Sequence, residues 1–267
     1  MNFPPIIYDI LRWLTILAMA GSIAIGFFTA FLLLIRRDIE NPWINRFFLL
    51  LIASTTFTLF DKFLDYIAIA DTHKSLSVLP FYMSFAVGPL TFFYVKSRLY
   101  QHFKPHRRDL KHFILPIVQS VLLAVVSISS VSSKQAFENH FFSPFYGNFE
   151  KGIFVAQYLA YLYFAYRFIN HFKTVLTNDY RRKKEVVKFP AIKKQILVVG
   201  WLKRFIKVAI ILFIIHGIFV YSDYFSYRLF GANLQTKALF SSLYQLSFAA
   251  CLIWQCVNAI FALRRKI

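Results

Sequence analysis

Residues 13–35 read WLTILAMAGSIAIGFFTAFLLLI, an uncharged stretch that Arg36 and Arg37 bring to an end. About 20 consecutive apolar residues suffice for a helix to cross the hydrocarbon core of a bilayer. Working outward from this stretch, we expect seven spans at about 13–35, 47–70, 76–95, 113–131, 152–172, 205–225 and 238–263. Continuous apolar runs predict helices, because a helix satisfies its own backbone hydrogen bonds in lipid. The sequence therefore predicts an all-α, polytopic membrane protein, a seven-transmembrane-helix bundle that forms one domain over residues 1–267.

The composition supports a lipid environment. Of the 267 residues, 58% are hydrophobic and only 16% are charged, whereas charged residues make up about a quarter of an ordinary soluble domain. A soluble fold of this length would leave much of that apolar surface in water. A soluble globular protein is therefore excluded as an interpretation.

The distribution of basic residues predicts the orientation. The chain carries 31 lysines and arginines and a formal charge of +19. Twenty-four of them lie in or beside the connections after spans one, three, five and seven, and only five lie in the alternate connections. Because cytoplasmic loops are enriched in lysine and arginine, we expect the N-terminus outside and the C-terminus in the cytoplasm.

A cytoplasmic basic surface is expected from the inner connections. Its members are Arg107, Arg108, Arg181, Arg182, Lys183, Lys184, Lys193 and Lys194. Basic residues near an anionic inner leaflet each contribute about 1 kcal/mol of attraction. Residues 191–207 resemble the start of an amphipathic helix that could lie on that leaflet. A nucleic-acid-binding role is not favoured, because the basic loop lacks a recognisable binding module.

Two carboxylates near the outer end of span two are candidates for a ligand or proton site. Asp61 and Asp65 are four residues apart, so they share one helix face. Ionisable groups inside a span are costly and often functional. The alternative is that the span ends near Asp61 and that both carboxylates lie among lipid headgroups.

A histidine near the centre of span six is a second candidate. His216 is followed seven residues later by Asp223, so the two should lie on the same helix face. Such a pair could hold a ligand or sense protons. The alternative is a histidine that hydrogen-bonds a neighbouring helix. No catalytic motif, phosphate-binding loop or metal-ligand cluster is recognisable, so we expect no cofactor, no metal and no enzymatic activity.

Three short motifs carry a resemblance to a known family. The first is LP at residues 79–80 with GPLTFFYVKS at 88–97, the second is DLKHFILP at 109–116, and the third is WLKR at 201–204. Within the first, Gly88 and Pro89 predict a kink in span three or a close helix approach, in a helix-packing motif that continues to Tyr94.

Together these motifs resemble the N-terminal membrane domain of the AraC-type transcriptional regulators of Bacteroidetes. That family joins a seven-helix membrane domain to a cytoplasmic DNA-binding domain. Here the sequence ends at Ile267, directly after span seven, where that DNA-binding domain would begin. The resemblance implies a multi-pass protein of the bacterial inner (cytoplasmic) membrane.

Three functions are compatible with these observations. We expect a non-enzymatic, sensor-like or scaffold-like membrane module that acts through another membrane or cytoplasmic protein. One alternative is a structural subunit of an envelope transport or secretion complex. The other is a membrane enzyme or carrier for a lipid, which would use Asp61, Asp65 or His216.

Overall fold

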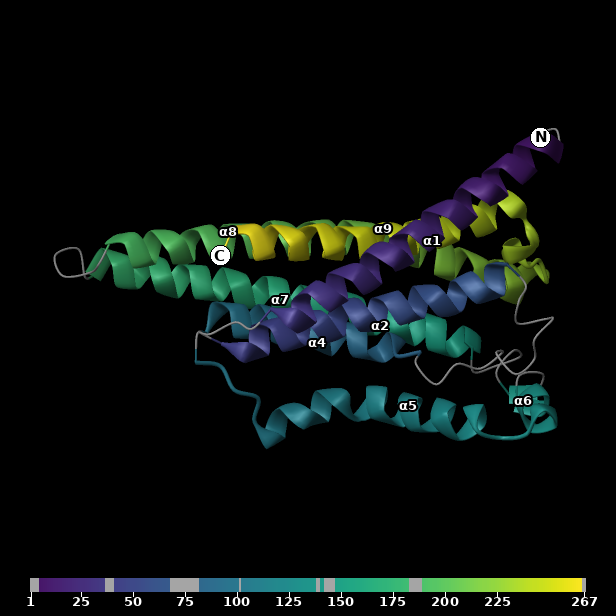
Figure 1. The fold of residues 1–267 in the computed structure, drawn as a ribbon, viewed down its shortest axis with the longest axis horizontal. Helices are drawn as coiled ribbons and strands as arrows, with labels where there is room; N and C mark the ends of the chain where they lie inside the picture. Colours follow the sequence, from purple (N-terminus) through teal and green to yellow (C-terminus); the bar gives the residue numbers. More distant parts are fainter. Residues whose placement is uncertain are drawn as a thin grey trace.

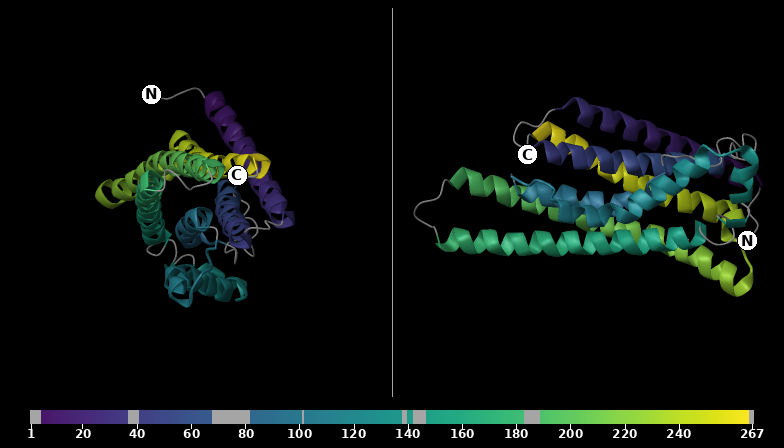
Figure 2. Two further views of the ribbon diagram at one scale, coloured as in Figure 1. Left: turned by 90° about the vertical axis from the view of Figure 1, so that its left-hand side faces the viewer. Right: turned by 90° about the horizontal axis from the view of Figure 1, so that it is seen from below.

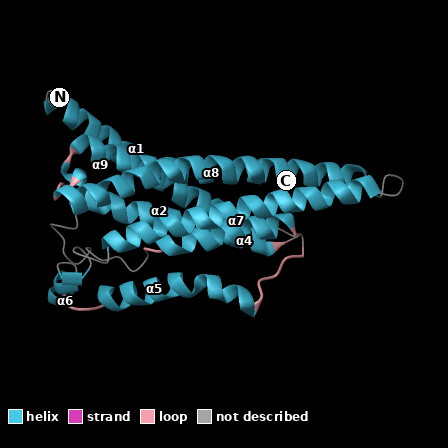
Figure 3. Cartoon of the chain, turned by 180° about the vertical axis from the view of Figure 1, so that it is seen from behind, coloured by secondary structure: helices cyan, strands magenta, loops and turns pink. Residues whose placement is uncertain are grey.

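The described part of the chain is helical. The computed structural model describes residues 5–36, 41–67, 82–100, 102–137, 140–141, 147–182 and 189–265, and these residues contain no β-strand (Figure 3). The longer helices are α1 (Pro5–Ile35), α2 (Pro42–Tyr66), α4 (Val87–Leu99), α5 (Ile114–Ser127), α7 (Gly147–Arg182), α8 (Phe189–Phe230) and α9 (Ala238–Arg265). The short ones are η2 (Ser84–Ala86), η3 (Arg107–Phe113), α6 (Val131–Phe137) and η5 (Leu234–Thr236). The prediction of an all-helical chain is confirmed for these residues.

Among the described residues, five segments are long enough and apolar enough to cross a membrane: Ile6–Ile35, Pro42–Tyr66, Arg107–Ser127, Lys194–Phe230 and Ala238–Leu263. Two helices fall short of that standard for different reasons. Helix α4 has only 13 residues, fewer than the roughly 20 that a span needs. Helix α7 is long, but its sequence is rich in tyrosine and other polar residues.

Several predicted spans differ from the helices in their bounds. The span at 76–95 lies partly outside the described residues, and its described part is η2 followed by α4. The span at 113–131 is approached by η3 and ends with α5 at Ser127, while residues 131–137 form the separate helix α6. The segment 191–207, expected as a surface helix, is continuous with the apolar part of α8.

Successive long helices run in opposite directions along the bundle (Figure 1). Helix α1 packs on α2 and α9, α2 packs on α4, α4 packs on α7, α7 packs on α8, and α8 packs on α9. Helix α5 lies outside this ring and is attached mainly through η2, η3 and α6, as the view along the bundle shows (Figure 2). The bundle is therefore a closed ring of six helices with one satellite helix.

Aromatic stacking fills the half of the ring around α4. The ring of Tyr94 lies 4.1 Å from that of Phe48, and the ring of Phe93 lies 5.6 Å from that of Phe47. Both α4 side chains are almost completely buried. Aromatic pairs in such geometry stabilise packing beyond the area they bury, so α4 is held although it is short.

Gly88 allows α4 to approach α7 closely. A Cβ atom at this position would lie 2.7 Å from Cδ2 of Tyr161. Pro89 stands in the first turn of α4, where its missing N–H group costs no helical hydrogen bond. Of the two roles expected for this motif, the geometry therefore displays the close approach.

The two ends of the bundle differ in charge. One end, here called the basic end, holds the close of α1, α7 and α9, the start of α2 and α8, and the connection between α4 and η3 (Figure 1). Its basic residues include Arg36, Arg46, Lys96, Arg98, Lys104, Arg107, Arg108 and Lys111. The other end, here called the acidic end after its four carboxylates Asp61, Asp65, Glu150 and Asp223, also carries Lys62, Lys134, Lys151, Arg228 and Lys237, so its charges are mixed.

Helices α7 and α8 project beyond the rest of the bundle at the basic end (Figure 1). Helix α8 has 42 residues and α7 has 36. At 1.5 Å per residue, α8 is about 60 Å long, which is roughly twice the hydrocarbon thickness of a bilayer. The two helices form a hairpin whose tip lies well away from the acidic end.

Candidate functional site

A buried lysine marks the centre of the acidic end. Lys62 lies on α2 and is 8% exposed. Its ammonium Nζ donates a hydrogen bond of 2.6 Å to the hydroxyl of Tyr244 on α9. The same Nζ lies 4.6 Å from the centre of the Tyr244 ring and 5.4 Å from that of Phe248. A desolvated cation gains from such ring faces, so α9 supplies both the hydrogen-bond acceptor and the aromatic wall.

His216 of α8 borders the same aromatic wall. Its Nδ1 lies 2.8 Å from the hydroxyl of Ser247 on α9, and its ring centre lies 5.0 Å from that of Tyr244. The side chain is 1% exposed. Lys62, Tyr244, His216 and Ser247, here called the Lys62 cluster, thus connect α2, α8 and α9.

A second buried polar group gathers around Glu150 in the first turn of α7. Its Oε1 accepts a hydrogen bond of 3.1 Å from Ser84 of η2 and a short one from Nε2 of Gln119 on α5. Gln119 also donates to Ser84 over 2.8 Å and accepts a hydrogen bond of 3.2 Å from the backbone N–H of Phe85. All three side chains are nearly inaccessible. Ser84, Gln119 and Glu150, here called the Glu150 cluster, attach the satellite helix to the ring.

Asp61 and Tyr82 lie between the two clusters. Asp61 interacts electrostatically with Lys62 and with Glu150, and Tyr82 interacts with Asp61, Glu150 and Tyr244. The half-buried Asp61 supplies a countercharge to the Lys62 ammonium. Asp65 lies one turn further along α2 and is exposed. The two predicted carboxylates therefore differ in environment: Asp61 is half-buried within the acidic end, and Asp65 is exposed at its surface.

A small cavity of about 10 Å³ reaches the Lys62 cluster from the acidic end. That volume is close to what one water molecule needs. Its lining residues are Lys151, Gly152, Val220, Tyr221, Asp223, Tyr224, Gln235 and Tyr244. Tyr244 therefore faces the cavity and also accepts the hydrogen bond from Lys62.

Asp223 occupies the mouth of this cavity. Its Oδ1 accepts a hydrogen bond of 3.0 Å from the backbone N–H of Leu234, at the start of η5. Asp223 shares the cavity lining with Tyr244, whereas the ring of His216 lies 5.0 Å from the ring of Tyr244. The bond that His216 makes is to the neighbouring helix α9, which is the alternative that the sequence left open.

The residues at the acidic end form a mixed-charge site. The carboxylates of Asp61, Asp65, Glu150 and Asp223 accompany the two ammonium groups of Lys62 and Lys151. Arg228 and Lys237 also lie at this end of the bundle, so the four carboxylates stand among basic groups, in a chain whose net charge is +19. A buried charge such as that of Lys62 is sensitive to its surroundings, because loss of a nearby opposite charge leaves it uncompensated. The site is therefore suited to respond to a small cation, or to a polar molecule about the size of water, that enters from the acidic end.

Sequence reasoning found part of this arrangement and missed the rest. Asp61 and His216 were recognised as ionisable groups inside apolar runs, and both lie at the buried site. Glu150 was missed because the predicted span began at Gly152, whereas α7 begins at Gly147. A usable signal was the Glu150–Lys151 pair directly before an apolar run. The partnership with Gln119 had no local signal, because 31 residues separate the two.

The other predicted residues lie away from this site. Gly88 and Tyr94 belong to the α4 packing described above. Arg107 and Arg108 are exposed on η3 at the basic end, and Lys194 is exposed on α8. The structure describes Arg181, Arg182 and Lys193 only as helical backbone, and Lys183 and Lys184 lie outside the described residues.

Within the described residues, no group of three or more His, Cys, Asp and Glu side chains is placed to hold a metal ion. No family model matches the chain, and neither a curated protein nor a solved structure matches it.

Proposed function

We propose that this chain is a seven-helix module of the bacterial inner membrane, with the acidic end outside and the basic end in the cytoplasm. Three observations support this placement. Five segments are long and apolar enough to span a bilayer, the long helices alternate in direction (Figure 1), and basic residues gather at one end. In this placement the chain begins outside and ends inside.

The proposed role is that of a non-enzymatic sensor, which receives a small cation or a polar molecule about the size of water at the acidic end. The observation that carries this role is the buried Lys62 ammonium, held by Tyr244 beneath a cavity that Asp223 and Lys151 line. A ligand in that cavity would change the charge balance around Lys62 at close range. Because the cluster joins α2, α8 and α9, such a change would act on the packing of three helices.

Helix α8 offers a direct route from this cluster to the cytoplasm. It carries His216 in the cluster and continues without interruption to Phe189 at the tip of the hairpin. A rigid helix with two alternative positions is a physical means of coupling distant sites. We propose that a protein partner binds the hairpin of α7 and α8 at the basic end and responds to its position. The resemblance to membrane-bound transcriptional regulators implies such a partner.

Double electron–electron resonance tests this coupling in the full chain reconstituted in nanodiscs. Spin labels at Ile35 of α1 and Val175 of α7 report the position of the hairpin, because both residues are exposed at the basic end. The expected result is that Lys62→Met shifts the distance distribution, since it removes the buried charge. Helix displacements of about 1–2 Å or more are typical of such transitions. The native Cys251 and Cys256 are buried and are replaced by alanine before labelling.

Arg46→Met is the matched control, because it removes an exposed cation from the same helix at the basic end. It should leave the distribution unchanged. Tyr244→Phe, which deletes only the hydroxyl that Lys62 contacts, repeats the test with a smaller perturbation. If neither Lys62→Met nor Tyr244→Phe moves the hairpin, the cluster only holds helices together, and the proposed sensing role is wrong.

A further inference from the structure

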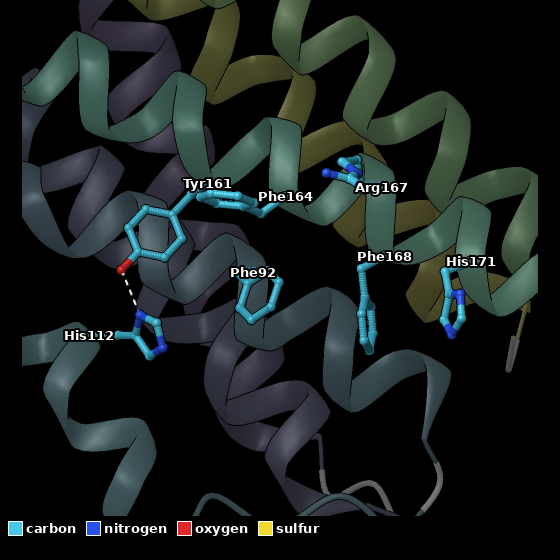
Figure 4. A pocket seen from close by; sticks show the side chains of 7 residues that line it. All are labelled: Phe92, His112, Tyr161, Phe164, Arg167, Phe168 and His171. Carbon is cyan, nitrogen blue, oxygen red and sulfur yellow. Dashed lines mark hydrogen bonds between the residues drawn. The ribbon is translucent and has the colours of Figure 1, made fainter.

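A large groove lies between α7, α4 and η3, apart from the buried clusters. Its volume is about 460 Å³, within the range of small-molecule sites in proteins. Phe92 of α4 and His112 of η3 face a stripe of α7 side chains, Tyr161, Phe164, Arg167, Phe168 and His171 (Figure 4). The stripe follows α7 toward the basic end, so the groove runs along the bundle.

One wall of the groove is fixed by hydrogen bonds and ion pairs. The Nδ1 of His112 lies 2.9 Å from the hydroxyl of Tyr161 (Figure 4). Lys96 of α4 lies 3.6 Å from Asp109, two residues after the start of η3. Asp109 also accepts a hydrogen bond of 2.8 Å from the backbone N–H of His106. Thus η3 is held against α4 at the position where it borders the groove.

The groove lining combines aromatic rings with hydrogen-bond donors, and none of the described residues that line it is acidic. Arg167 carries a fixed positive charge, and its guanidinium lies 5.9 Å from the ring of Tyr163. His112 and His171 add ring nitrogens that can donate hydrogen bonds. Arginine is well suited to phosphate, because its planar group can donate two parallel hydrogen bonds. The lining therefore complements an anion that carries an apolar body.

The groove is also open toward the lipid. Helix α5 continues from η3 but packs little on α4 and α7, and side chains such as Val118 and Val121 are more than half exposed. Phe164, at the edge of the groove, is 54% exposed. Acyl chains can therefore reach the groove along α7 from the bilayer without crossing water.

We propose that this groove binds one anionic phospholipid of the cytoplasmic leaflet. Its phosphate is held by Arg167 and His171, and the upper part of its acyl chains packs on Phe92, Phe164 and Phe168. A free phosphate ion would occupy only a small part of 460 Å³ and would leave the aromatic lining without a partner. The inference rests on the membrane placement above but is independent of sensing at the acidic end.

Native mass spectrometry of the purified chain tests the proposal. The protein in a neutral detergent is titrated with phosphatidylglycerol and, separately, with phosphatidylcholine of the same chain length. We expect one phosphatidylglycerol to bind at least fivefold more tightly than phosphatidylcholine. Arg167→Gln with His171→Gln should abolish that preference. Phe164→Ala should weaken both lipids to a similar degree, because it removes contact with the chains and not with the phosphate.

Arg204→Gln is the control, since it removes an exposed basic residue of α8 that does not line the groove. It should retain the preference of the unmodified protein. His171→Gln alone, at an exposed position, repeats the test if the double variant does not fold.

Equal affinity for the two lipids would overturn the proposal. Displacement of phosphatidylglycerol by millimolar inorganic phosphate would instead assign the groove to a free anion. Neither result bears on the hairpin distances measured with Lys62→Met, so the two proposals fail separately.

Discussion

Helices α4 and α5 are joined by a single connection through η3, yet they relate to the bundle in opposite ways. Helix α4 is short, contains polar residues and is almost entirely buried. Helix α5 belongs to one of the five described segments that are long and apolar enough to cross a membrane, but only Pro116, Gln119, Leu123 and Val126 are buried along it. In a membrane, apolar side chains can face the lipid, so apolar character does not predict which helix is buried. Close packing and hydrogen bonds between helices determine which helix lies inside the bundle. The less apolar helix is therefore the central one.

The largest expected effect comes from breaking the packing of α4. Phe93→Ala removes a ring that is 1% exposed and lies 5.5 Å from the ring of Phe113 and 5.6 Å from that of Phe47. The cavity should lower the free energy of unfolding by about 3 kcal/mol. The measurement is reversible unfolding in mixed micelles followed by tryptophan fluorescence. Val118→Ala on α5, at a largely exposed position, should change the same quantity by less than about 0.5 kcal/mol. Equal losses at the two sites would contradict the comparison.

An intermediate effect is expected where α5 is attached. Gln119→Leu keeps a similar volume but removes the donor to Ser84 and Glu150 and the acceptor for the backbone of Phe85. Leaving these buried groups unpaired should cost about 2 kcal/mol. Ser120→Ala is the neighbouring control, because that hydroxyl bonds only the backbone of Pro116 within its own helix. A neutral Gln119→Leu would show that α5 is not held by the Glu150 cluster.

The sequence was sufficient for the helical class and for most helix positions, because long uncharged runs such as 13–35 and 238–263 have few alternatives. It was less informative where tertiary contacts decide the structure. Residues 191–207 have an apolar face suited to a membrane surface, but Leu202 and Phe205 are buried in the bundle as part of α8. The groove between α7, α4 and η3 likewise depends on residues from three elements. Only the spacing of its five α7 residues can be recognised in the sequence.

The same limit applies to the buried clusters. Asp61 and His216 stand out in the sequence because ionisable groups are rare in apolar runs. The hydrogen-bond partners of the neighbouring Lys62 and of His216 are Tyr244 and Ser247, which are ordinary residues of an apolar helix until the fold places them opposite α2 and α8. The sequence thus identifies which buried polar groups need hydrogen-bond partners, whereas the packing of α9 determines which residues are those partners.

The smallest expected effect on stability tests the burial of α4 at a single position, Gly88. Gly88→Ala places a Cβ atom 2.7 Å from Cδ2 of Tyr161, so the Tyr161 ring must shift and its contact with His112 must lengthen. Overpacking of this kind costs about 1–3 kcal/mol, while replacing a helical glycine by alanine gains up to about 1 kcal/mol. The net result should be a destabilisation of about 1 kcal/mol. Gly21→Ala in α1, where a Cβ would meet nothing within 4 Å, should have the opposite sign, because only the helical gain remains. If both substitutions stabilise the protein in the same unfolding assay, α4 does not need its close approach to α7. The depth of α4 in the bundle would then rest on its aromatic residues alone.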